Sequence, residues 1–126
     1  MSDWSYSLGN GYVIVRSSSK SIHLVYSEYD ENYGTIVLNN FYITEYSQSK
    51  HHIGLSGIPT TGLSASEEEV KSDVRVFYCV NVDSGKVFGP YSTEEPLIVY
   101  SPELAHWKST KDIPNILAEQ DSQLSK

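Results

Sequence analysis

The chain has 126 residues and a mass of 14.1 kDa, which is enough for one compact core. It carries 16 acidic residues against 9 Lys and Arg, a formal charge of −7, and it has no basic run, which excludes a direct nucleic-acid binder. No stretch approaches the roughly 20 consecutive apolar residues that a membrane-spanning helix needs, so we expect no membrane insertion.

The first third of the chain has the pattern of short β-strands. Large and small residues alternate over 4–8, which is the period of a half-buried strand. Gly and Asn at 9–11 predict a tight turn, because both residues tolerate positive φ. We therefore expect a hairpin with 12–16, followed by a third strand at 22–26.

An acidic loop at 27–34 separates these strands from the next ones. The β pattern resumes at 35–38, at 41–46 and in a short strand at 51–55. From 54 to 73 Gly, Ser, Thr and Pro dominate, so this segment is predicted to be a long, mobile loop.

A second hairpin is predicted in the last third of the chain. Strands at 74–82 and 86–88 flank the turn residues Asp83, Ser84 and Gly85. Ser92 then has the features of a helix N-cap, with acidic residues following in the first turn.

The C-terminal part contains the predicted helices. The run 97–100 is ambiguous between helix and strand, a short helix is expected over 102–107, and a helix or a frayed tail follows Pro114. We expect an α+β fold with an antiparallel, meander-like sheet and one or two short C-terminal helices. Residues 1–112 would form a single domain, and 113–126 its C-terminal helix or tail.

The predicted core follows the inward positions of these strands. Trp4 and Trp107 are expected near the sheet edge or the helix interface. The other expected core residues are Val13, Val15, Leu24, Ile36, Leu38, Ile43, Val76, Tyr78, Val80 and Phe88.

Cys79 is the only cysteine, so no internal disulfide can form. The N-terminal residues lack the basic and apolar segments of a secretory signal, and we expect a cytoplasmic protein with reduced thiols. Cys79 lies in the apolar run 76–80 without a neighbouring cation. It is predicted to be a small buried hydrophobic residue and not a reactive thiol.

No motif for catalysis, a metal or a cofactor is present. His51 and His52 are adjacent, so in a strand they would face opposite sides, and His23 and His106 have no ligand at a metal-binding spacing. The sequence has no phosphate-binding loop and no nucleophile elbow. We therefore expect no metal, no cofactor and no enzymatic activity.

Acidic residues interleaved with tyrosines form the main candidate site. Carboxylates attract a basic surface over long range, and tyrosine supplies rigid contact area. The same acids also suit a second interpretation, in which they only keep the protein soluble. The candidate partner-binding residues are Glu28, Tyr29, Asp30, Glu31, Tyr33, Glu67, Glu68 and Glu69.

The stretch 78–92, YCVNVDSGKVFGPYS, resembles a recurrent piece of small bacterial α+β proteins, some of them encoded beside toxins. In size, acidity and β-richness the whole chain resembles the immunity proteins of contact-dependent growth inhibition and other polymorphic toxin systems. This resemblance implies that the protein binds and neutralises a cognate toxin, often a basic nuclease, in the cytoplasm of the producing cell. It offers no catalytic motif to transfer.

The leading functional hypothesis is therefore an immunity-type protein that binds a basic protein toxin through electrostatic and aromatic contacts. The main alternative is a structural or assembly subunit, such as a homodimer joined through an exposed strand edge. An enzyme would require a pocket with converging polar groups.

Overall fold

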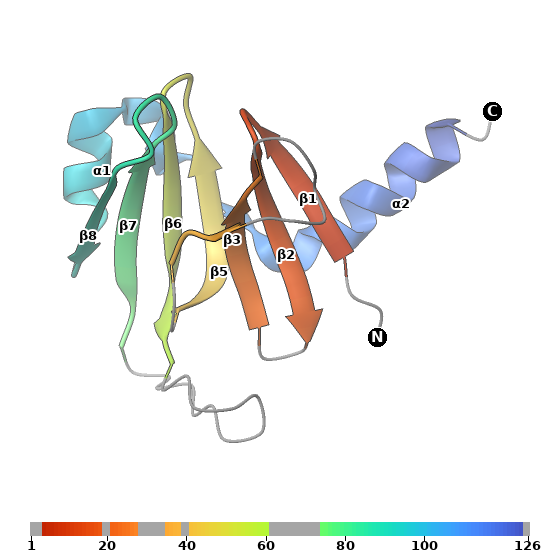
Figure 1. The fold of residues 1–126 in the computed structure, drawn as a ribbon, viewed down its shortest axis with the longest axis horizontal. Helices are drawn as coiled ribbons and strands as arrows, with labels where there is room; N and C mark the ends of the chain where they lie inside the picture. The colour runs from red at the N-terminus through yellow and green to blue at the C-terminus, as the bar shows by residue number, and fades with distance from the viewer. Residues whose placement is uncertain (1–3, 19–20, 28–34, 39–40, 61–73, 125–126) are drawn as a thin grey trace.

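The computed structural model describes residues 4–18, 21–27, 35–38, 41–60 and 74–124. Their strands form two antiparallel sheets, and short helices follow towards the C-terminus (Figure 1). The predicted α+β class with a meander-like strand order is confirmed, although the strands divide between two sheets instead of forming one.

The first sheet is a four-stranded meander in the order β1-β2-β3-β4. The alternation predicted for β1 is confirmed, because Trp4, Tyr6 and Leu8 are half-buried and the residues between them are exposed. The turn to β2 has positive φ at Gly9, Asn10 and Gly11, a conformation that suits these two residue types. The strands are β1 Trp4–Gly9, β2 Tyr12–Ser18, β3 Ser21–Tyr26 and β4 Thr35–Ile36.

The second sheet has five strands in the order β8-β7-β6-β5-β9. Four of them pair with their neighbours in sequence, and the short β9, which the sequence pattern did not predict, adds to the free side of β5. The strands are β5 Phe41–Gln48, β6 His52–Pro59, β7 Val76–Asn81, β8 Val87–Tyr91 and β9 Lys108–Ser109.

The prediction of a loop over 54–73 is wrong for its first part, since residues 54–59 belong to β6. The small residues that suggested a loop are needed in this strand because neighbouring atoms leave no room for a side chain. A Cβ on Gly57 would overlap the carbonyl oxygen of Tyr42 on the adjacent strand, and one on Gly54 would overlap Ser47. Residues 61–73 lie outside the described part of the chain.

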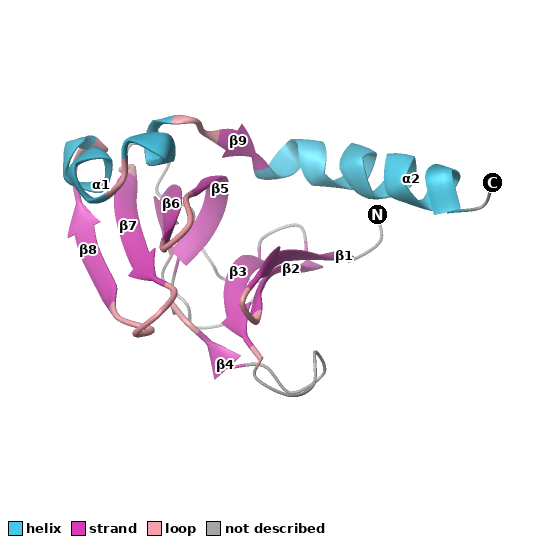
Figure 2. Ribbon diagram, turned by 90° about the horizontal axis from the view of Figure 1, so that it is seen from above, coloured by secondary structure: helices cyan, strands magenta, loops and turns pink. Residues whose placement is uncertain are grey.

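The main hydrophobic core lies between the two sheets, which cross at an angle (Figure 2). Leu24, Ile43 and Val80 are buried in it as predicted. Ile36 was predicted to be core but is 45% exposed, because β4 is a two-residue strand at the sheet edge. The pattern missed Ile14 and Ile22. The buried members are Tyr12, Ile14, Ile22, Leu24, Phe41, Ile43, Tyr46, Ile53, Leu55, Val80 and Ile113.

Helix α1 (Glu95–Tyr100) and the 3-10 helix η1 (Pro102–Ala105) form a third layer on the other face of the five-stranded sheet. Leu97 and Leu104 are fully buried there against Cys79. The ambiguous run 97–100 is therefore helical. The predicted N-cap at Ser92 is wrong: the cap residue is Glu94, without a side-chain hydrogen bond to the helix.

The chain then passes through β9 and the 3-10 helix η2 (Thr110–Asp112) into α2 (Ile113–Leu124). The segment after Pro114 is thus a helix and not a frayed tail, at least as far as Leu124. Its first residue, Ile113, is buried in the main core, and the helix then projects away from the sheets (Figure 1). Within the described ranges no helix has the length and apolarity to cross a membrane.

Replacing Gly54 with Ala tests how closely α1 approaches the sheet. A Cβ there would overlap Ser47 and would lie 3.2 Å from both Leu97 and Trp107. Because the site is buried, we expect Gly54→Ala to lower the free energy of unfolding by about 1–3 kcal/mol in urea denaturation. Ser5→Ala, on the exposed side of β1, is the control and should change it by less than about 0.5 kcal/mol.

The predicted burial of Cys79 is confirmed, and burial raises the pKa of its thiol from 9.0 to about 11. Between these pH values the unfolded chain has lost the thiol proton that the folded chain keeps. The free energy of unfolding should therefore fall with rising pH, by up to about 1.4 kcal/mol per pH unit from this group. Urea denaturation from pH 8 to 11 should show a shallower decline for Cys79→Ala, and equal slopes would contradict the assignment.

Candidate protein-interaction surface

All the residues predicted from the sequence to bind a partner lie outside the described part of the chain, so their role stays a prediction. The residues that flank the acidic segment 28–34 are described. Tyr26 pairs with Thr35 across β3 and β4, and the Ser27 N–H donates a hydrogen bond to the Gly11 carbonyl at 2.9 Å. The residues on both sides of the acidic segment therefore lie at one end of the four-stranded sheet.

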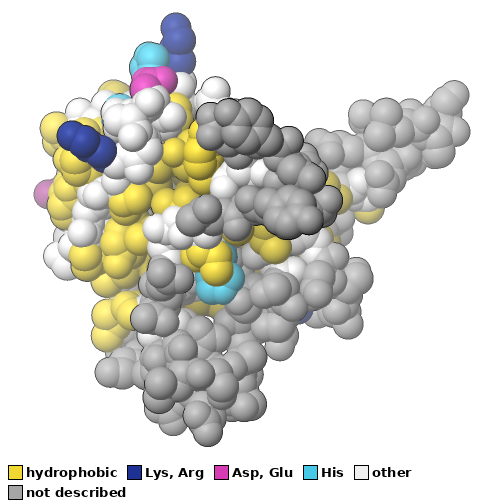
Figure 3. Space-filling model, viewed as in Figure 1, with side chains coloured by type: hydrophobic (Ala, Val, Ile, Leu, Met, Phe, Trp, Pro, Cys, Tyr) yellow, Lys and Arg dark blue, Asp and Glu magenta, His cyan; other side chains and the backbone are white. Residues whose placement is uncertain are grey.

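An open cleft of about 470 Å³ lies beside these flanks, between the two sheets. Tyr12 and Tyr26, with ring centroids 4.9 Å apart, form one wall together with Ile36. The turn after β7 and Val87, the first residue of β8, form the other wall. Figure 3 shows hydrophobic side chains gathered over β7 and β8, where the four-stranded sheet does not cover them.

A second surface lies on the helix layer and is made entirely of described residues. Val99 is 85% exposed and Tyr100 is 40% exposed, so two neighbouring residues of a short helix present apolar groups to solvent. Ile98 beside them and two aromatic residues of β8 are half-buried. We call this set the α1 surface; it consists of Phe88, Tyr91, Ile98, Val99 and Tyr100.

Tyr100 is held in place by three aromatic neighbours. Its ring stacks on Phe88 with centroids 5.2 Å apart and on His52 with centroids 5.6 Å apart. Its hydroxyl lies 3.3 Å from the hydroxyl of Tyr91. A large aromatic side chain that is already ordered loses little conformational entropy when a partner covers it.

Hydrogen bonds at both ends fix α1 on the sheet. Before the helix, Glu94 Oε2 accepts a bond of 2.5 Å from the indole N–H of Trp107, which follows η1. After it, the Ser101 hydroxyl lies 3.1 Å from His52 Nδ1 and accepts a bond of 2.9 Å from Ser49. The α1 surface is therefore presented by a helix that is anchored to the turn and strand beneath it.

The charge of the helix layer is negative. Residues 92–107 contain Glu94, Glu95 and Glu103 but neither Lys nor Arg. Glu95 and Glu103 are exposed, and Glu95 lies one helical turn before Val99, on the same side of α1. The α1 surface thus combines exposed apolar and aromatic groups with carboxylates.

The histidines take separate partners, as their adjacency suggested. His51 Nδ1 lies 2.7 Å from Asp83 Oδ2 in an exposed pair, whereas His52 points to Ser101. Among the described residues there is no group of three His, Cys, Asp or Glu side chains that could hold a metal ion.

Sequence reasoning missed the α1 surface although the signal was present. Val99 and Tyr100 follow two glutamates and a proline. Because the sequence left 97–100 ambiguous between helix and strand, the exposed side of this segment could not be identified. Trp107 was correctly expected at the helix interface.

Comparison with known proteins gives no relative: no family model, no curated protein and no solved structure matches the chain.

Removing the Glu94 carboxylate should loosen the helix layer. Glu94→Ala leaves the half-buried indole N–H of Trp107 without its acceptor, and we expect a loss of about 1–3 kcal/mol in urea denaturation. The exposed Glu103→Ala is the control for loss of a nearby charge and should cost less than about 0.5 kcal/mol. Equal losses in the two variants would show that the indole bond contributes nothing.

Proposed function

We propose that the protein is an immunity-type inhibitor, which binds and neutralises a cognate protein toxin with a basic nuclease domain. The observation that carries the proposal is the α1 surface, where an exposed Val99 and an ordered Tyr100 adjoin the carboxylates of Glu95 and Glu103. Aromatic anchors within a charged rim are the usual composition of a tight protein interface.

The charges favour a basic partner. A nuclease must bind phosphate groups, so its active cleft carries Lys and Arg. An inhibitor with carboxylates around an apolar anchor can be steered to that cleft over long range and then held by contact. The acidic segment 28–33 would add to the same attraction, since the protein as a whole has a charge of −7.

The alternative, a homodimer through a strand edge, has little support from the five-stranded sheet. At one edge of the five-stranded sheet β8 contains Pro90, which has no N–H to pair, and at the other edge β9 spans two residues. Self-association through the α1 surface would bring the glutamates of two copies together across a two-fold axis. Both features favour a partner of different, basic composition.

The probe in the test is a basic C-terminal domain of a secreted protein, where the reading frame next to this one in the source genome encodes such a protein. We expect Val99→Asp to weaken binding about 10- to 100-fold, chiefly through faster dissociation. Glu95→Lys should slow association and reduce its dependence on NaCl concentration. Surface plasmon resonance at several NaCl concentrations measures both rates.

Matched controls lie on α2, where Ala118→Asp and Glu119→Lys introduce the same charges at exposed positions. Equal weakening by these controls would remove the α1 surface from the interface. Reversing Glu28, Asp30 and Glu31 to Lys tests the acidic segment separately. A stable, salt-insensitive homodimer in sedimentation that does not bind the basic domain would favour the assembly subunit.

A further inference from the structure

A second cavity, of about 390 Å³, lies far from the α1 surface, where the beginning of α2 meets both sheets. Its walls come from segments widely separated in the sequence. The aromatic and apolar lining residues are Trp4 of β1, Ile22 of β3, Tyr42 of β5 and Pro114 of α2. A volume of this size is in the range of small-molecule sites.

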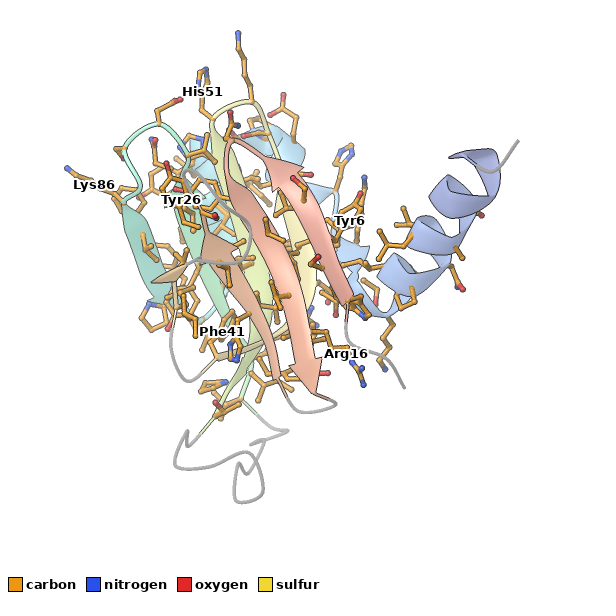
Figure 4. The ribbon with its side chains drawn as sticks, turned by 45° about the vertical axis from the view of Figure 1, so that its right-hand side comes forward. Tyr6, Arg16, Tyr26, Phe41, His51 and Lys86 are labelled. Carbon is orange, nitrogen blue, oxygen red and sulfur yellow. The ribbon has the colours of Figure 1, made fainter. Side chains whose placement is uncertain are left out.

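Two cationic side chains line the same cavity. Arg16 of β2 is 8% exposed, and Lys111 of η2 is exposed to solvent. Arg16 makes interactions within the protein, but a guanidinium has five N–H donors and can serve more than one acceptor. Figure 4 shows Arg16 at the end of the first sheet that lies beside the beginning of α2.

This concentration of positive charge is unusual in so acidic a chain. Acidic residues outnumber Lys and Arg by 16 to 9, yet none of the described residues that line the cavity is acidic. The nearby carboxylate of Glu45, which lines an adjoining cavity with Lys111, is paired with Arg75. Asp112 is exposed and does not belong to the lining.

The backbone at Lys111 is also held in position. The Thr110 hydroxyl is buried and lies 3.1 Å from the Ile43 carbonyl and 3.0 Å from that of Thr44, which fixes η2 to β5. In addition, Ser109 caps η2 by accepting a bond of 3.2 Å from the Lys111 N–H. The backbone that carries the ammonium group is thus set before any ligand arrives.

We propose that this cavity binds a small anionic molecule with a flat apolar body, such as an aromatic carboxylate or phosphate monoester. The indole of Trp4 and the ring of Tyr42 would contact the flat body, while Arg16 and Lys111 would bind the anionic group. This cavity shares no lining residue with the α1 surface, so the proposal does not rest on the proposed toxin binding.

Phenyl phosphate is the probe, and the two indole N–H resonances in an NMR titration are the readout. Trp4 lines the cavity, whereas Trp107 lies in the helix layer, so the second tryptophan is a built-in control. We expect the Trp4 resonance to shift and that of Trp107 to stay. Phenol, which lacks the charge, and inorganic phosphate, which lacks the ring, should each bind at least about ten-fold more weakly.

Because the Lys111 side chain is exposed, Lys111→Gln should leave the fold intact and weaken phenyl phosphate binding several-fold. Lys108→Gln, another exposed lysine nearby that does not line the cavity, is the matched control and should bind like wild type. Arg16→Met should weaken binding further, provided that circular dichroism shows it folded. Three results would each overturn the proposal. They are phenol binding as tightly as phenyl phosphate, equal shifts of the Trp4 and Trp107 resonances, and an affinity of Lys111→Gln for phenyl phosphate equal to that of wild type.

Discussion

The arrangement of this protein depends on the middle of the five-stranded sheet, around β6, which is covered on both faces. On one face Ile53, Leu55 and Val80 pack against the four-stranded sheet. On the other face the helix layer approaches so closely that a Cβ on Gly54 would lie 3.2 Å from both Leu97 and Trp107, and Cys79 is buried beside it. Small residues in the middle of the sheet therefore decide where α1 lies, and through it where Val99 and Tyr100 are displayed.

Much of the fold could be predicted from the sequence, because local patterns are strong where one face of a strand is exposed. The alternation in β1, the Gly-Asn-Gly turn and the second hairpin are examples. The same rules failed for β6. A strand buried on both faces shows no alternation of polar and apolar residues. Its glycines are needed because residues distant in the sequence lie close to them. The division into two sheets is likewise a matter of long-range packing.

The interaction surface was less accessible to sequence reasoning. The acidic tyrosine-rich segments stand out in composition, whereas Val99 and Tyr100 stand out only once Leu97 is known to point into the sheet. The anion site has no local signature at all, since Trp4, Arg16, Tyr42 and Lys111 come from four separate elements. Such a convergence is a property of the tertiary structure.

The helix layer is attached to the sheet through the small cluster around Leu97, Leu104 and Cys79, apart from the main core. Local opening of this layer would expose the thiol of Cys79. A partner seated on α1 would oppose this opening by mass action. The rate at which an alkylating reagent modifies the native protein would thus report occupancy of a surface that the thiol itself never touches.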